Sequence, residues 1–264
     1  MVKLKRNRTV VDRATEYLIR AALVGIALYA LNRLALAPHF SGIRFFRAYW
    51  DDILALPVFI PLSFWLARKF SVLQPDKYLS WIHILLGWLV FSIVFEWLVP
   101  LLITHRYSDW GDVNAYALGG ILLWWFSRWA IDFAHLRTTP IEVIYYDGTC
   151  GICQASMNWS SKRFKSVDTL DFHPYQNLDP NKNKELYSLA AKTVVAQLSD
   201  GTILSRNRAA GLVFLSLKTP WWWIGWLLTL QVLKPLTNPG YRLLARNRHR
   251  LSRWFGLTSC AIVS

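Results

Sequence analysis

The sequence predicts a membrane α-helical half followed by a smaller α/β domain. Two observations indicate this fold class. The first half is strongly apolar and carries four long stretches with few charges, whereas the second half alternates short apolar runs with polar helical patterns. The second half also contains an apolar run, a turn and then a Cys-x-x-Cys pair, which is typical of a strand, a turn and a helix. We expect the two parts to cover residues 1–138 and 139–264.

The four apolar stretches are each close to the roughly 20 residues needed to cross a hydrocarbon core of about 30 Å. Pro57 and Pro61 interrupt the second stretch, but membrane helices tolerate proline when neighbouring groups satisfy the freed carbonyls. Several Trp residues fall near the segment ends, where the indole ring prefers the membrane interface. We therefore expect four transmembrane helices, at residues 18–36, 53–70, 79–104 and 115–133.

Basic residues in the connections predict the orientation of these helices. The amino terminus and the second connection are rich in Lys and Arg, whereas Arg is balanced by Asp in the first and third connections. The positive-inside rule then places the amino terminus in the cytoplasm. Four spans return the chain to the same side, so we expect an integral membrane protein with a cytoplasmic α/β domain. Cytoplasmic thiols are kept reduced, which favours a cycling or reducing role over a structural disulfide.

Ionisable residues within or beside an apolar segment mark candidate sites. Glu96 lies inside the third stretch, and the loop that follows carries Arg106, Asp109 and Asp112. This acidic helix followed by an Arg and Asp loop resembles the VanZ-like membrane proteins, although Tyr116 stands where that family usually has Asn. The resemblance implies a non-cytoplasmic site made by Glu96 and this loop.

The second half predicts a regular order of strands and helices. Apolar and alternating runs indicate strands, and a Ser-Asp-Gly turn joins the last two as a hairpin because Gly can adopt positive φ. An order of strand, helix, strand, helix, hairpin and helix is typical of an α/β sandwich. The expected strands are 141–146, 169–175, 193–198 and 202–205, and the expected helices before the hairpin are 150–164 and 182–191.

Cys150 and Cys153 are two residues apart, and the chain contains one further cysteine, Cys260. If Cys150 begins a helix, the free backbone N–H groups and the helix dipole favour its thiolate. Cys153 then lies one turn further on, close enough to attack a mixed disulfide on Cys150. We expect Cys150 to be the attacking thiol and Cys153 the resolving thiol.

A zinc site and an inert pair are alternative interpretations of the two cysteines. Tetrahedral zinc needs four ligands, and the remaining candidates do not stand at the spacing of a second ligand pair. Those candidates are His173, His249 and Cys260. The sequence therefore favours a redox dithiol, with no metal and no cofactor.

The run from Tyr146 to Cys153, Tyr-Asp-Gly-Thr-Cys-Gly-Ile-Cys, resembles the signature of the DCC family of predicted thiol-disulfide oxidoreductases. Three further segments resemble the family in the same order, so the resemblance covers about residues 141–256. They are residues 172–176, the turn at 200–201 and the Arg-rich helix at 241–248. The resemblance implies a thioredoxin-like fold, a redox pair at Cys150 and Cys153, and a protein disulfide or dithiol as the partner.

Two residues near the dithiol have open roles. Thioredoxins place a cis proline before the hairpin, and this chain has Thr193 there, which could offer its backbone to a partner strand. Asp147 could relay protons to Cys153 if burial raises its pKa. Asp followed by Gly is also ordinary turn chemistry and can cap a helix, and the sequence slightly favours this structural role.

The formal net charge of +14 fits a domain beside anionic lipids, because each basic side chain near such a surface contributes about 1 kcal/mol. Nucleic-acid binding would also use a basic cluster, but it is the less simple explanation. Residues 221–236 are rich in Trp but short for a fifth span, so we expect them to pack on the domain or lie in the interface. The expected lipid-binding residues are Arg242, Arg246, Arg248, Arg250 and Arg253.

Two functions compete. The first is a membrane-anchored thiol-disulfide oxidoreductase that exchanges disulfides with protein partners on the cytoplasmic side. The second is a membrane binding or assembly protein whose α/β domain only docks partners.

Overall fold

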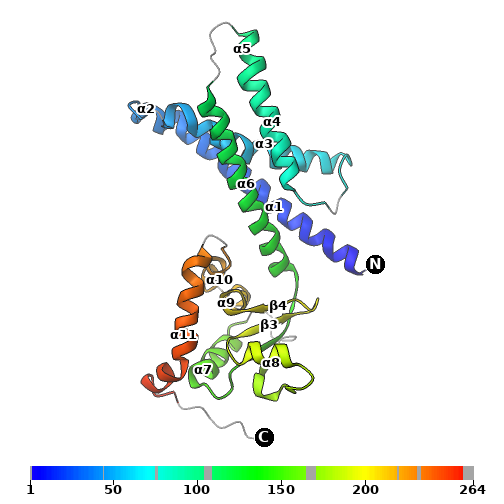
Figure 1. Ribbon diagram of the computed structural model, residues 1–264, viewed down its shortest axis with the longest axis vertical. Helices are drawn as coiled ribbons and strands as arrows, with labels where there is room; N and C mark the ends of the chain where they lie inside the picture. Colours follow the sequence, from blue (N-terminus) through cyan, green and yellow to red (C-terminus); the bar gives the residue numbers. More distant parts are fainter. Residues whose placement is uncertain are drawn as a thin grey trace. The chain divides into compact units, whose positions relative to one another are not determined.

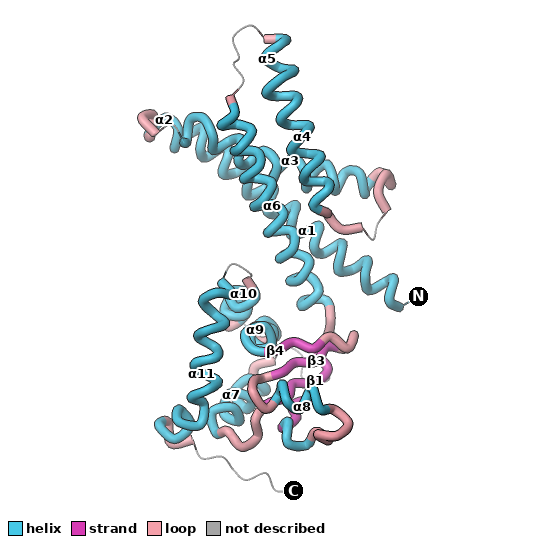
Figure 2. The backbone as a smooth tube through the Cα atoms, in the orientation of Figure 1, coloured by secondary structure: helices cyan, strands magenta, loops and turns pink. Residues whose placement is uncertain are grey.

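The structure is a computed structural model, and it describes residues 2–43, 45–74, 77–103, 109–164, 171–218, 220–230 and 233–257. The chain forms two compact units, Met1–His135 and Leu136–Ser264. Figure 1 shows helices throughout the first unit, and in Figure 2 the strands fall in the second unit.

Three helical segments of the first unit are long and apolar enough to cross a membrane, namely Arg8–His39, Phe45–Lys69 and Trp81–Leu102. They correspond to the first three expected spans. The fourth expected span falls on α6 (Trp110–Thr138), which is 29 residues long but is not one of these three helices. Unlike a plain apolar span, α6 carries Asp112, Arg128 and Asp132 along its length.

Each of the three segments contains a π-helical turn. The first is built from α1 (Val2–Leu31), η1 (Asn32–Leu36) and α2 (Ala37–His39). The second is η2 (Phe45–Tyr49) followed by α3 (Trp50–Lys69), and the third runs through α4 (Trp81–Ile93), η3 (Val94–Leu98) and α5 (Val99–Leu102). In the first and third segments the π turn directly precedes a proline turn, at Pro38 and Pro100. Proline has no N–H to donate to the preceding turn of a helix. The wider π turn accommodates this lost hydrogen bond.

The first unit packs around apolar side chains of α1, α3, α4 and α6, including Leu18, Leu56 and Leu123. Gly119 lets α6 approach α3 closely, since an added Cβ there would overlap the carbonyl oxygen of Ile53. Small residues permit this close backbone approach in membrane helices. Large apolar side chains also remain exposed along the three segments, among them Val24, Phe59 and Val90.

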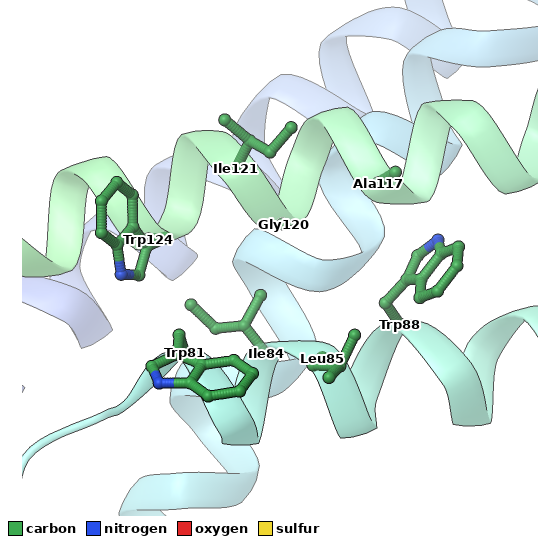
Figure 3. Close-up of a pocket in the computed structure, with 8 residues that line it drawn as sticks. All are labelled: Trp81, Ile84, Leu85, Trp88, Ala117, Gly120, Ile121 and Trp124. Carbon is green, nitrogen blue, oxygen red and sulfur yellow. The ribbon is translucent and has the colours of Figure 1, made fainter.

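A shallow apolar pocket of about 280 Å³ lies between α4 and α6. Figure 3 shows the two helices side by side, with the lining residues of each labelled. The α4 side is lined by Trp81, Ile84, Leu85 and Trp88, and the α6 side by Ala117, Gly120, Ile121 and Trp124.

The second unit contains a four-stranded mixed sheet in the order β2-β1-β3-β4. β1 pairs with β2 in parallel and with β3 in antiparallel fashion, and β3 and β4 form an antiparallel hairpin. Gly201 turns this hairpin with φ of 83°, as the sequence predicts. The strands are β1 Ile141–Tyr146, β2 Asp171–Pro174, β3 Val195–Leu198 and β4 Ile203–Ser205.

Helices pack on this sheet around a core that includes Ile144, Leu198 and Leu212. α7 contacts β1, α9 contacts β3 and β4, and α11 contacts both α7 and α9 (Figure 1). The helices are α7 Gly151–Ser161, α8 Lys184–Ala190, α9 Arg206–Ser216, α10 Trp222–Thr229 and α11 Lys234–Trp254, and a short 3-10 turn η4 covers Tyr175–Asn177.

The Trp-rich segment at 221–236 does not form one long helix. α10 has eight residues, which is too short to cross a bilayer, and it packs against α9. Gly225 lies so close to α9 that an added Cβ would stand 2.6 Å from the carbonyl oxygen of Gly211. This close packing agrees with the expectation that residues 221–236 pack on the domain. The sequence analysis did not predict α9, whose buried residues include Ala209, Gly211 and Leu212.

Candidate active site

The turn between β1 and α7 places Cys150. The Oδ1 atom of Asp147 accepts hydrogen bonds from the Thr149 N–H at 2.9 Å and the Thr149 hydroxyl at 2.8 Å. The Cys150 N–H donates to the Asp147 carbonyl oxygen at 3.3 Å. Cys150 then stands at the N-cap of α7 with extended backbone angles. The helix therefore begins at the dithiol, as the sequence predicts.

The structure brings the two sulfur atoms together. The Cys153 thiol donates to Cys150 Sγ over 2.6 Å, and both residues are free cysteines. Cys150 has no exposed surface, whereas Cys153 is partly exposed. These accessibilities differ from the expected order of attack, which requires Cys150 to meet the substrate first.

The carboxyl end of α11 covers Cys150. Ser252 Oγ lies 3.7 Å from Cys150 Sγ and accepts a hydrogen bond from the Ile152 N–H at 2.9 Å. The chain beyond α11 also packs on Gly151, where an added Cβ would overlap the carbonyl oxygen of Leu257. The Ile152 N–H, which could stabilise a thiolate at the start of α7, is thus bonded to Ser252 instead. The sequence analysis missed Ser252 because it is distant in the chain and belongs to no local motif.

Asp147 is buried, and both of its carboxylate oxygens have bonding partners. Its Oδ1 also accepts from Gln176 Nε2 at 2.9 Å, and its Oδ2 pairs with Arg248 at 2.7 Å. Burial by itself raises the pKa of Asp147, but the hydrogen bonds from Thr149 and Gln176 and the Arg248 charge outweigh burial and hold that pKa below its ordinary value. A proton relay needs the opposite shift. The geometry therefore favours the structural role.

Arg248 faces the site rather than solvent. Its side chain is 17% exposed, and its Nη2 bonds both Asp147 Oδ2 and the Ala191 carbonyl oxygen, the latter at 2.9 Å. The sequence analysis grouped Arg248 with the lipid-binding arginines, because a linear cluster does not reveal which helical face each member occupies. This assignment needs correction for Arg248, whose guanidinium is bound within the domain.

Thr193 is buried and lies under α11. Its hydroxyl donates to the Tyr241 hydroxyl oxygen at 3.0 Å, and the Val194 N–H donates to the same oxygen at 3.1 Å. The Thr193 N–H, which was expected to meet a partner strand, donates instead to the Leu189 carbonyl oxygen at 3.2 Å.

The Cys153 thiol is held in its protonated form. Burial raises its pKa, and the hydrogen bond to Cys150 adds to the increase, while the Arg248 charge opposes it. A raised pKa lowers the fraction of Cys153 present as thiolate near neutral pH, so its reactivity as a nucleophile increases with pH.

Cys153 opens onto an apolar cavity of about 860 Å³. The cavity lies among α7, α9, α10 and α11, and its polar end is formed by Asp147, Cys153 and Arg248. Its apolar walls include Met157, Trp159, Val213, Phe214, Leu228 and Leu244.

The membrane-half candidates are partly brought together. Glu96 is buried in η3, and its carboxylate accepts from the Asp109 N–H at 3.0 Å and the Tyr116 hydroxyl at 3.5 Å. Asp112 lies in the first turn of α6, and its N–H donates to the Asp109 carbonyl oxygen at 3.1 Å. Arg106 lies outside the described residues. The expected site at Glu96 stays a prediction. The structure adds Tyr116 to the residues that contact the Glu96 carboxylate.

Among the described residues, no group of three or more His, Cys, Asp or Glu side chains is arranged to hold a metal ion. His249 Nε2 lies 3.6 Å from Asp147 Oδ2.

Comparison with known proteins identifies the second unit. Residues 144–254 match the family model described as DCC1-like thiol-disulfide oxidoreductase. This region is a DCC1-like domain. The match confirms the expected resemblance to the DCC family. A relative of the DCC1-like domain, the uncharacterized protein YuxK of Bacillus subtilis (strain 168), is 25% identical over 122 residues, or 44% of this chain and 82% of YuxK. No solved structure matches the chain.

Proposed function

We propose that the protein is a membrane-anchored thiol-disulfide oxidoreductase whose Cys150 and Cys153 cycle between dithiol and disulfide. The observation that carries this proposal is the pair of sulfur atoms 2.6 Å apart at the start of α7, inside a DCC1-like domain. A thioredoxin-like fold is part of the proposal. It is supported by a parallel β1-β2 pair followed by an antiparallel hairpin that extends the same sheet beside β1.

Accessibility supports an exchange that begins at Cys153. The Cys153 thiolate attacks one sulfur of a substrate disulfide, the substrate S–S bond breaks, and the first thiol leaves with a proton. Cys150 Sγ then attacks Cys153 Sγ and displaces the second thiol. The dithiol is oxidised to a disulfide, and two electrons and two protons reach the two product thiols. An external dithiol then reduces the pair again.

Single-cysteine variants of the full chain test this order, in a Cys260→Ser background. Cys150→Ser is expected to trap a mixed disulfide on Cys153, whereas Cys153→Ser is expected to react slowly, because Cys150 is buried. Both variants should lose turnover of a model disulfide. The opposite trapping pattern would show that α11 moves away and that Cys150 attacks first. Full turnover without either cysteine would disprove the proposed function.

Membrane anchoring belongs to the proposal. The three apolar segments support it, and we include α6 as the fourth span because its 29 residues exceed the roughly 20 needed. With four spans the DCC1-like domain stands on the same side as the amino terminus, which the positive-inside rule places in the cytoplasm.

Anionic lipids are proposed as partners of α11. Arg242, Arg246, Arg250 and Arg253 are all exposed, and their spacing of four, four and three residues places them on one face of α11. Leu243 and Trp254 are exposed beside them. A helix with a basic and an apolar exposed face suits a lipid interface.

A second candidate function is a membrane binding or assembly protein. The buried Glu96, bonded by Asp109 and Tyr116, favours it because it is a polar centre independent of the dithiol. In that case replacing both cysteines would leave the cellular phenotype intact, while Glu96→Gln would abolish it. The reverse pattern would favour the oxidoreductase.

A further inference from the structure

The cavity beside Cys153 has the size and lining of a small-molecule site. Its volume of about 860 Å³ lies within the range of roughly 300–1,000 Å³ found for ligand pockets. Aromatic and aliphatic side chains such as Trp159, Phe214 and Leu228 form most of the wall. A few polar groups also line the wall, among them Asp147, Cys153 and Arg248, and such a small set of polar groups can orient one end of a ligand.

The cavity wall favours a neutral ligand. Asp147 and Arg248 are the only charged residues among the described residues that line it, and they pair with each other at 2.7 Å. A charged ligand would lose its hydration without gaining an unpaired counter-charge, which is unfavourable.

α11 disfavours a protein strand at the same place. Tyr241 occupies the Val194 N–H, and Ser252 occupies the Ile152 N–H, so two backbone donors flanking the dithiol are already bonded. Cys150 is buried under the end of this helix. Cys153, the residue that remains partly accessible, lines the apolar cavity.

We infer that the cavity binds small neutral disulfides with an apolar body and that these are the substrates of the dithiol. The inference rests on the proposed function and specifies its substrate class. The bound disulfide places one sulfur near Cys153 Sγ and its apolar groups against Trp159, Phe214 and Leu228. Exchange then proceeds with the electron and proton balance given above.

A matched pair of disulfides tests the inference. Dipropyl disulfide and hydroxyethyl disulfide have the same number of heavy atoms, but the second has a hydroxyl where the first has a methyl. The full chain in lipid nanodiscs, with dithiothreitol as reductant, is expected to prefer dipropyl disulfide by about tenfold in kcat/KM after the uncatalysed rate is subtracted. Insulin is the third substrate and represents disulfides carried by a protein.

Variants that fill the cavity separate binding from simple lipid partitioning. Ala210→Leu and Ala245→Leu act on two different walls and should reduce the preference for dipropyl disulfide toward unity. Asn247→Leu adds the same side chain elsewhere on α11, outside the lining, and should leave the preference unchanged. Partitioning is the same for all variants and cancels in this comparison.

Mass spectrometry gives a second measurement that does not need turnover. The Cys150→Ser, Cys260→Ser variant treated with dipropyl disulfide is expected to carry a propylthio adduct on Cys153, and Ala210→Leu should slow its formation. Efficient reduction of insulin with no preference between the small disulfides, and no effect of Ala210→Leu, would overturn the inference but leave the proposed function intact. Failure to reduce any of the three disulfides would instead remove the proposed function.

Discussion

At the residue scale, the ion pair between Asp147 and Arg248 joins the turn before the dithiol to the last helix. Asp147 is 3% exposed and accepts bonds from Thr149 and Gln176 as well. Removing one member of a buried pair leaves the other charge without a partner, which is more destabilising than losing an exposed ion pair. This pair therefore determines how firmly α11 is held over the site.

The Asp147→Asn substitution should lower the local stability of the turn and of the start of α7 by about 3 kcal/mol at pH 7. Because folding lowers the pKa of Asp147, its contribution is present above the unfolded pKa of about 3.9 and is lost as the pH falls through the lower folded value. Amide hydrogen exchange of the full chain measures the effect. Asp179→Asn, at an exposed turn, is the control. Equal protection of the backbone amides in Asp147→Asn and Asp179→Asn at pH 7 would contradict the prediction.

Cys153 should react with thiol reagents about tenfold faster for each pH unit between pH 7 and 9. Its raised pKa keeps the thiol protonated in this range, whereas an ordinary cysteine, with a pKa of about 8.5, approaches its plateau. Iodoacetamide alkylation of Cys153 in the Cys260→Ser chain, located by peptide mass spectrometry, measures the slope with Cys150 still in place. Free cysteine under the same conditions is the reference, and a plateau below pH 8 would refute the raised pKa.

At the element scale, α11 connects three parts of the DCC1-like domain. It bonds the Val194 backbone through Tyr241, Asp147 through Arg248, and the start of α7 through Ser252. The same helix carries its exposed arginines on the opposite side. Displacement of α11 would therefore uncover Cys150 and the Val194 N–H, just before β3, together.

Gly151→Ala should expose Cys150. A Cβ at position 151 overlaps the carbonyl oxygen of Leu257, so the chain after α11 must shift. We expect maleimide labelling of Cys150, in a Cys153→Ser, Cys260→Ser background, to accelerate by about tenfold, which corresponds to about 1.4 kcal/mol of opening free energy. Gly240→Ala on α11 is the matched control, because no atom lies within 4 Å of an added Cβ there. Unchanged labelling in Gly151→Ala would show that Leu257 does not cover the site.

At the scale of the whole molecule, the number of spans determines which compartment the dithiol meets. Three helical segments qualify by length and composition, and α6 follows them before the DCC1-like domain begins. With α6 as a fourth span the domain lies on the side of the amino terminus, and without it the domain lies on the other side.

A membrane-impermeant maleimide applied to intact cells should leave Cys153 unlabelled, and labelling should appear once the membrane is permeabilised. The reason is that the proposed four spans would place the domain on the cytoplasmic side. A cysteine introduced at exposed Asp200, in the β3-β4 turn, is a control for the domain that does not depend on the buried site. Labelling of Cys153 and of the cysteine introduced at position 200 in intact cells would contradict the fourth span. It would also imply that the dithiol faces an oxidising compartment.

The sequence by itself determined the features that depend on short-range patterns. Apolar stretches of membrane length predicted the first three segments, and a strand, a Gly turn and Cys-x-x-Cys predicted β1, α7 and the adjacent sulfur atoms. The β3-β4 hairpin followed from its turn residues. These elements can be predicted locally, because period, length and turn chemistry are properties of neighbouring residues.

Tertiary structure alone decided what surrounds the sulfur atoms. Ser252, Arg248 and Tyr241 reach the site from α11, about 50 to 100 residues away in sequence from the atoms that they bond. No local pattern encodes such contacts, because they depend on the path of the whole chain and on which face of α11 packs inward. For that reason Cys150 became buried, Cys153 became the accessible sulfur, and Arg248 was committed to Asp147 rather than to solvent.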